Sequence, residues 1–191
     1  MELYIPDAHA VQQFYINNKD QAYWAKVWPA SVGLCIFLQQ NIGIIKNKNV
    51  LELAAGLGLP GLSIATNAGR VTITDKEPLA KTFVQQSAKY LQLKNVTART
   101  LSWQQSISEP LPDVVLLSDV NYEPEVFEEL WQVIQYFLNN NITVIISTPQ
   151  RLVAKDFIAR LLPFVAQQWN DNIELDNRET SVSVFVLTKD L

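Results

Sequence analysis

Short apolar segments recur along the chain from residue 49 onward, separated by longer stretches. The apolar segments are rich in branched residues, which favours strands, and helices are expected between them. The expected strands are 50–53, 71–74, 97–101, 114–118 and 143–147, and the expected helices are 60–68, 77–92, 124–139 and 151–166. Because the strand segments show little alternation of apolar and polar residues, helices should cover both faces of their sheet.

The end of the chain follows a different pattern. Two further strand segments, 172–176 and 181–188, are joined directly by the turn 177–180, which predicts an antiparallel pair. The alternating β and α units before them predict a parallel sheet with right-handed crossovers. The expected fold class is therefore α/β, a Rossmann-like, doubly wound, seven-stranded and mostly parallel sheet with a C-terminal antiparallel hairpin.

The first part of the chain lacks this alternation. Residues 1–27 are polar with interspersed aromatic residues, and a helix is expected from Pro29 to about Gln40, because proline is favoured at the first helical position. We expect residues 1–48 to form an N-terminal extension and helix that pack on a core of residues 49–191, with one compact domain overall.

Composition narrows the functional classes. The chain has 191 residues, 48% of them hydrophobic, and a formal net charge of −4 without a Lys/Arg run, so a nucleic-acid partner is not expected. Cys35 and His9 are the only residues of their types, which predicts neither a disulfide framework nor a metal site. The start has no signal-peptide pattern and no apolar run reaches the ~18 residues of a membrane span, so a cytoplasmic protein without a membrane partner is expected.

Residues 49–75 carry the densest motif. A strand leads into a Gly-rich turn and a helix, and a second strand then ends at Asp75. This order builds a pocket for an adenosine-bearing cofactor at the carboxyl ends of two neighbouring strands. Asp75 is placed to bind the hydroxyls of a ribose; the alternative is that it caps the helix beginning near Glu77 and Pro78.

The identity of the cofactor needs a further distinction. The turn Gly56-Leu-Gly58-Leu-Pro-Gly61 spells the GxGxxG of dinucleotide-binding folds. Glu52, however, lies inside the first strand, the terminal hairpin is not the usual dinucleotide ending, and the chain has no second domain for a reducible substrate. The Glu52 carboxylate either contacts the amino-acid part of a cofactor or braces the turn.

At these residues the chain resembles a known family. Glu52-Leu-Ala-Ala-Gly-Leu-Gly58 looks like the acidic-x-Gly-x-Gly-x-Gly motif of class I S-adenosylmethionine-dependent methyltransferases. From about residue 20, the chain is similar to the protein-lysine methyltransferase group, methyltransferase family 16. The segments that carry this similarity, besides the Gly-rich turn, are Val27-Trp28-Pro29-Ala30, Thr74-Asp75, Ser102-Trp103 and Asp119-Val-Asn-Tyr122. In two places the chain departs from the pattern, since Ala54 replaces the first glycine and Ser102 stands where an aspartate is more common.

The resemblance implies S-adenosyl-L-methionine as the cofactor and assigns residues to it. Trp103 is expected to form a wall against the adenine ring, and Trp28 to lie beside the methyl-transfer region; the alternative for both is ordinary packing. The cofactor-binding residues expected in this way are Trp28, Glu52, Ala54, Ala55, Gly56, Gly58, Asp75, Lys76, Trp103 and Ser118.

Asp119 and Tyr122 are the expected catalytic residues. They follow the fourth parallel strand and therefore face the same crevice as the cofactor. A carboxylate that accepts hydrogen bonds from an acceptor amine would orient it and stabilise its developing positive charge, and a tyrosine would add a cation–π or hydroxyl contact. The alternative is that both residues only begin the next helix. The Asp/Asn-Pro-Pro-Tyr/Phe motif of nucleic-acid amino-methyltransferases occupies the same place, but the two prolines are missing here.

These residues together predict an N-methyltransferase that uses S-adenosylmethionine and acts on a lysine side chain of a protein substrate. One alternative is a methyltransferase of a small amine or another metabolite. A second is a non-catalytic binding module, for which Ala54 in the Gly-rich turn is the motive.

Overall fold

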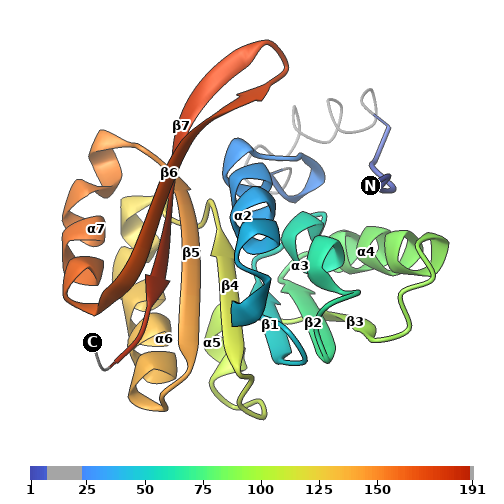
Figure 1. Cartoon of the computed structure of the whole chain (residues 1–191), viewed down its shortest axis with the longest axis horizontal. Helices are drawn as coiled ribbons and strands as arrows, with labels where there is room; N and C mark the ends of the chain where they lie inside the picture. Colours follow the sequence, from blue (N-terminus) through green and yellow to red (C-terminus); the bar gives the residue numbers. More distant parts are fainter. Residues whose placement is uncertain (8–22, 190–191) are drawn as a thin grey trace.

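A single seven-stranded sheet forms the centre of the protein (Figure 1). The computed structural model describes residues 1–7 and 23–189. The strands lie in the order β3-β2-β1-β4-β5-β7-β6; the first five along the chain are parallel, and β7 runs antiparallel to both β5 and β6. Their bounds are β1 Asn49–Leu53, β2 Arg70–Asp75, β3 Val96–Thr100, β4 Val114–Ser118, β5 Thr143–Pro149, β6 Val165–Leu175 and β7 Arg178–Leu187. The predicted fold class is confirmed.

Helices cover both faces of the sheet (Figure 1). The first face carries α2 (Pro29–Gln40), α3 (Leu59–Ile64) and α4 (Pro78–Tyr90), and the second carries α5 (Trp103–Ser106), α6 (Phe127–Asn139) and α7 (Lys155–Leu161). Short 3-10 turns connect these elements at η2 Tyr23–Ala25, η3 Ile42–Ile44, η4 Pro124–Val126, η5 Leu152–Ala154 and η6 Leu162–Phe164. No helix in the described ranges is long and apolar enough to cross a membrane.

Strand β4 shows why the apolar segments do not alternate with polar residues. Val114 and Leu116 enter the hydrophobic cluster under α2, α3 and α4, whereas Val115 and Leu117 enter the cluster under α6 and α7. All four side chains are buried. Because successive side chains of a strand point to opposite faces, a strand covered on both sides must be apolar at every position. Each such buried side chain contributes about 1.5–3 kcal/mol to folding.

The strand order reverses between β1 and β4. β1 pairs with β2 on one side and with β4 on the other. The loops that leave the carboxyl ends of these strands therefore diverge to opposite faces, which opens a crevice at this edge of the sheet.

The structure corrects several predicted boundaries. The helix expected at 60–68 ends at Ile64, and the one expected at 151–166 is α-helical only in its middle, as α7, with the 3-10 turns η5 and η6 on either side. Pro163, in η6, prevents continuation of that helix, because proline lacks the N–H needed in a helix interior. β6 begins at Val165 instead of 172. The sequence did not reveal its first residues because this edge strand is largely exposed and polar and lacks the apolar run of a central strand.

The hairpin turn is tighter than expected. Its two central residues are Asp176 and Asn177, with φ angles of +52° and +58°, rather than the predicted 177–180. This left-handed pair matches the twist of a two-residue hairpin, which asparagine and aspartate tolerate better than most residues. The hairpin extends past the end of β5 (Figure 1).

Candidate functional site

A cavity of about 420 Å³ lies at the carboxyl ends of β1, β2 and β4. This volume falls within the range of small-molecule sites, about 300–1,000 Å³. Ten of the twelve predicted site residues line it: Trp28, Ala54, Ala55, Gly56, Asp75, Lys76, Trp103, Ser118, Asp119 and Tyr122. Glu52 and Gly58 are not among its lining residues.

The Gly-rich turn forms the floor of the cavity in a left-handed conformation. Ala54, Gly56 and Gly58 have φ angles of +50°, +54° and +70°. A Cβ on Gly56 would lie 2.8 Å from the carbonyl oxygen of Trp24, so only glycine fits there. Ala54 is exposed and accepts the strain of this conformation, about 1–2 kcal/mol for a residue with a Cβ.

Glu52 braces the turn from below. It is only 1% exposed, and its Oε2 accepts the Gly61 N–H at 2.7 Å, while Oε1 has no partner among the described residues. Burial raises the pKa of Glu52 to about 8, and the nearby Asp75 adds to the rise. Of the two interpretations of Glu52, the structure therefore supports bracing rather than cofactor contact. Gly58 also serves the packing beneath the turn, because a Cβ added there would lie 3.0 Å from the side chains of Ile73 and Val84.

Asp75 satisfies backbone groups and lines the cavity at the same time. Its Oδ2 accepts the Gly56 N–H at 2.8 Å and its Oδ1 accepts the Glu77 N–H at 2.9 Å. Burial raises the pKa of Asp75, and these backbone hydrogen bonds oppose the rise. Each carboxylate oxygen retains a second lone pair, so the capping interactions leave acceptor capacity for a ribose diol.

Trp103, which is expected to contact the adenine ring, lines the cavity. This residue begins α5, where Ser102 and Gln105 form a reciprocal capping box, so Ser102 has a structural role at the start of the helix. The indole N–H of Trp103 donates to Glu129 of α6, which fixes the plane of the ring. Lys76 follows Asp75 as an exposed side chain, and Ser118 lies half-buried at the end of β4.

An aromatic row, formed by Trp28, Tyr23 and Tyr122, also lines the cavity. The ring of Tyr23 lies 6.1 Å from that of Trp28 and 5.3 Å from that of Tyr122, and the Trp28 indole N–H donates to the Tyr23 carbonyl at 3.0 Å. Burial raises the pKa of Tyr122 to about 12, so its phenol is neutral at ordinary pH. Tyr23 and Trp24 were missed at the sequence level because η2 is too short to show a periodic pattern.

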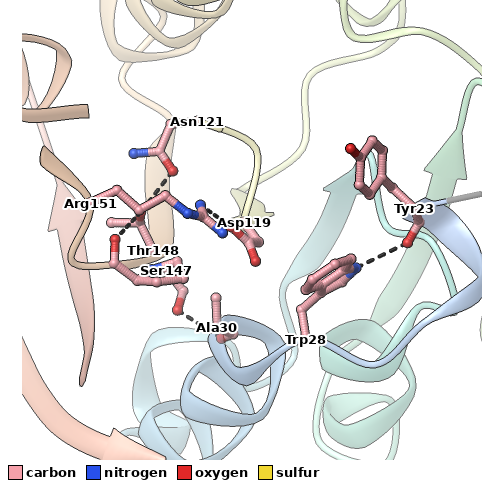
Figure 2. Close-up of polar contacts among 9 residues, drawn as sticks. Tyr23, Trp28, Ala30, Asp119, Asn121, Ser147, Thr148 and Arg151 are labelled. Atoms are coloured by element: carbon pink, nitrogen blue, oxygen red, sulfur yellow. Dashed lines mark hydrogen bonds and ion pairs between the residues drawn. The ribbon is translucent and has the colours of Figure 1, made fainter. Parts of the chain in front are cut away.

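The loop after β4 is attached to the end of β5 by three contacts (Figure 2). The Asp119 N–H donates to the Ser147 carbonyl at 2.9 Å, and the Thr148 hydroxyl donates to Asn121 Oδ1 at 2.7 Å. Arg151 forms an ion pair with Asp119 Oδ1. These contacts hold Asp119 at a φ of +56°, a costly conformation that directs its side chain to the cavity lining.

The cavity fits an adenosine-bearing cofactor better than a metal. The Gly56 side of the turn packs against the backbone of Trp24, and the buried indole N–H of Trp24 has no partner among the described residues although Trp24 lines the cavity. The described ranges contain no group of three His, Cys, Asp or Glu side chains able to hold a metal ion. His9 lies outside the described residues, whereas Cys35 is a buried free thiol.

The fold and the cavity define a class: a Rossmann-like domain whose cofactor pocket lies at the switch point and whose sheet ends in an antiparallel hairpin, as in class I methyltransferases. The profile of the lysine methyltransferase family matches residues 11–164. The chain belongs to this family, which confirms the resemblance to S-adenosylmethionine-dependent methyltransferases inferred from its motifs.

Individual relatives agree with this assignment. The protein N-lysine methyltransferase METTL21A of Danio rerio is 33% identical over 64% of this chain and 59% of its own length. The histone-arginine methyltransferase METTL23 of Rattus norvegicus is 32% identical over 62% of this chain and 56% of its own length. The chain thus spans less than two thirds of these relatives. The crystal structure of the N-methyltransferase NodS from Bradyrhizobium japonicum WM9, in complex with S-adenosyl-L-homocysteine, has the same fold, with a TM-score of 0.66, 14% identity and coverage of 94% of this chain and 97% of that one.

Proposed function

We propose that this protein transfers a methyl group from S-adenosylmethionine to a lysine side chain of a protein. The observation that carries the proposal is that Asp119 and Tyr122 line the same cavity as the Gly-rich turn and Asp75. An acceptor amine held at Asp119 would thus lie next to a cofactor held by the turn. The two relatives described above are both named as methyltransferases of protein side chains, which favours a protein acceptor over a small metabolite.

Cofactor binding would rest on the residues at the carboxyl ends of β1, β2 and β3. In this proposal Asp75 accepts the ribose hydroxyls, Trp103 covers one face of the adenine, and the backbone around Ala55 and Gly56 receives the amino-acid part. When bound, S-adenosylmethionine supplies a methyl group activated by a sulfonium. Lys76 and Ser118 complete the proposed contacts at the ends of β2 and β4.

The acceptor would enter between the aromatic row and the Asp119 loop. Tyr23, Trp28 and Tyr122 offer ring faces that attract an alkylammonium chain and exclude water around it. Asp119 would accept a hydrogen bond from the amine, orient its lone pair and stabilise the positive charge that develops on nitrogen. We keep a cytoplasmic location as part of the proposal, supported by the single, unpaired cysteine.

Calorimetric titration with S-adenosylhomocysteine and, separately, with NAD tests the cofactor. We expect binding of the first in the micromolar range or tighter and no heat from NAD; the reverse result would remove the proposal. The Asp75→Asn variant should weaken the first affinity about tenfold or more, because an amide accepts only one of the two hydroxyl donors well.

Transfer of labelled methyl groups from the cofactor into a cell lysate, resolved by size, tests the acceptor. We expect label in a protein band, and acid hydrolysis of that band should release methyllysine. Release of methylarginine instead would assign the acceptor chemistry of the METTL23 relative, and label confined to small molecules would contradict a protein acceptor. Asp119→Asn should lower the rate at least about 100-fold while leaving cofactor affinity within threefold.

A further inference from the structure

The two oxygens of the Asp119 carboxylate have different surroundings (Figure 2). Oδ1 is paired with the guanidinium of Arg151, whereas Oδ2 is buried and has no partner among the described residues. The Asp119 side chain is 6% exposed and that of Arg151 29%. One oxygen of a largely buried carboxylate is thus engaged by a permanent cation, and the other is a buried acceptor whose hydrogen bond none of the described residues supplies.

Backbone hydrogen bonds before and after Arg151 in the sequence fix the position of this residue. It follows β5 directly and precedes η5, and the neighbouring Gln150 N–H donates to the Ser181 carbonyl of β7 at 3.1 Å. The Ala154 N–H donates to the Arg151 carbonyl at 3.1 Å. Arg151 is not among the residues that line the cavity, so it reaches the acceptor side of the site only through Asp119.

The other charged groups that line the cavity carry an excess of negative charge. From β2 and the residues after it come Asp75, Lys76 and Glu77, from α6 comes Glu129, and from the segment before α2 comes Lys26. Burial makes the largest contribution to the raised pKa of the Tyr122 phenol, and the charges of Glu123 and Asp119 add to the rise. The phenol therefore carries no charge at ordinary pH. An amine that enters this cavity would hold its proton strongly unless a cation compensates Asp119.

This proton decides whether the reaction can occur. The lone pair of the neutral nitrogen forms the new N–C bond while the electron pair of the breaking C–S bond stays on sulfur, and the product nitrogen carries the positive charge until a proton leaves to water. A protonated nitrogen has no lone pair for this step. A unit charge about 6 Å away, at an effective dielectric constant of about 20 to 40, moves the protonation midpoint of an amine by about one to two pH units.

We propose that Arg151 is a positioning residue that acts through Asp119: it fixes one oxygen of the carboxylate and offsets its charge, so that the acceptor amine binds the other oxygen in its neutral form. This inference rests on the proposed function. It adds a residue that follows β5 to the site, although this residue does not line the cavity, and it gives that residue an electrostatic role.

The test is the pH dependence of methyl transfer into the acceptor band found in the lysate experiment. Rates are measured from pH 6 to 10 for the wild type and for Arg151→Gln, Arg151→Met and Arg151→Lys. The matched control is Arg160→Gln, which removes an arginine from an exposed ion pair with Glu128; neither residue lines the cavity. Calorimetry with S-adenosylhomocysteine and thermal melting accompany each variant.

Removal of the charge in R151Q should shift the acid limb of the pH profile upward by about one unit or more, which is about a tenfold loss of rate at pH 7 that recovers at high pH. R151M should behave like R151Q, R151K should stay within half a unit of the wild type, and R160Q should not change the profile. Affinity for S-adenosylhomocysteine should stay within threefold throughout.

Two outcomes would overturn the inference. If R151Q and R151M lower the rate by the same factor at every pH, Arg151 has only a structural role. If they are faster than the wild type at pH 7, Arg151 competes with the acceptor for Asp119. A wild type that binds S-adenosylhomocysteine but labels no fraction of the lysate would instead contradict the proposed function, and this is recognised before any variant is compared.

Discussion

The buried Glu52 should make the stability of this fold depend on pH. Burial raises its pKa from an ordinary 4.5 to about 8, the Gly61 hydrogen bond opposes that rise, and the charge of Asp75 adds to it. Between these two values the folded protein binds a proton that the unfolded chain releases. The contribution of Glu52 to stability is therefore fully present below about pH 4.5 and is lost as the pH rises through about 8. At about 1.4 kcal/mol for each pH unit, the upper limit of this loss is about 5 kcal/mol.

Urea unfolding at pH 5, 6, 7, 8 and 9 measures this effect. Glu52→Gln keeps a carbonyl oxygen for the Gly61 N–H and cannot ionise, so its free energy of unfolding should not fall with the wild type's between pH 5 and 9. We expect the difference between the two proteins to change by about 2–5 kcal/mol over this range in favour of the variant. Glu174→Gln, at an exposed position on β6, is the matched control and should follow the wild type. Parallel curves for Glu52→Gln and the wild type would refute the argument that Glu52 is protonated in the fold.

Other positions give further expectations. Gly56→Ala should lower the free energy of unfolding by at least about 2 kcal/mol and weaken S-adenosylhomocysteine binding about tenfold, because its Cβ would lie 2.8 Å from a carbonyl oxygen at a positive φ. Gly43→Ala is the control for the same urea and calorimetry experiments. It should change neither quantity, since no atom from elsewhere in the described residues lies within 4 Å of the new Cβ. Ala54→Gly should raise the free energy of unfolding by about 0.5 kcal/mol, since relief of the left-handed strain exceeds the added chain entropy; a loss in urea unfolding would contradict this. Cys35, whose pKa burial raises to about 12, should react with a thiol reagent at pH 8 only after unfolding in urea.

The sheet was predictable because burial on both faces leaves a direct mark on the sequence. β4 and the interior of β1 carry apolar residues at nearly every position, and their predicted bounds agree with the observed strands within one residue. The start of β6 was not predictable in this way. Its first half is an exposed edge held by backbone pairing with β7, and backbone hydrogen bonds place no demand on the polarity of the side chains.

The conformation of the Gly-rich turn was also predictable, since it depends on local constraints. A positive φ, a close backbone approach and a carboxylate at the end of a strand each restrict the residue type at one position, as at Gly56 and Asp75. Arg151 lies 32 residues from Asp119 in the sequence, and only the pairing of β4 with β5 brings the two together. One arginine after a strand carries no signal of its partner. The position of Glu52 was predicted, but whether its carboxylate points into the cavity or beneath the turn depends on the path of α3.

The attachment of the Asp119 loop to β5 divides the site into two parts that should respond independently. The Ser147 carbonyl accepts the Asp119 N–H and the Ser147 hydroxyl donates to the Ala30 carbonyl at 2.7 Å, so the end of β5 fixes both the loop and the start of α2, beside Trp28 (Figure 2). The Gly-rich turn, by contrast, is fixed by Asp75 and Glu52 of β2 and β1. Among the described residues, the contacts at the end of β5 and those at the Gly-rich turn share no hydrogen bond or ion pair. Substitutions at the end of β5 should therefore change the rate of methyl transfer to the acceptor and leave cofactor affinity intact. Substitutions in the turn should weaken cofactor affinity and leave the rate at saturating cofactor intact. The rate at saturating cofactor and the calorimetric affinity separate these effects, so the separate roles of the end of β5 and of the Gly-rich turn can be tested without knowledge of the acceptor's sequence.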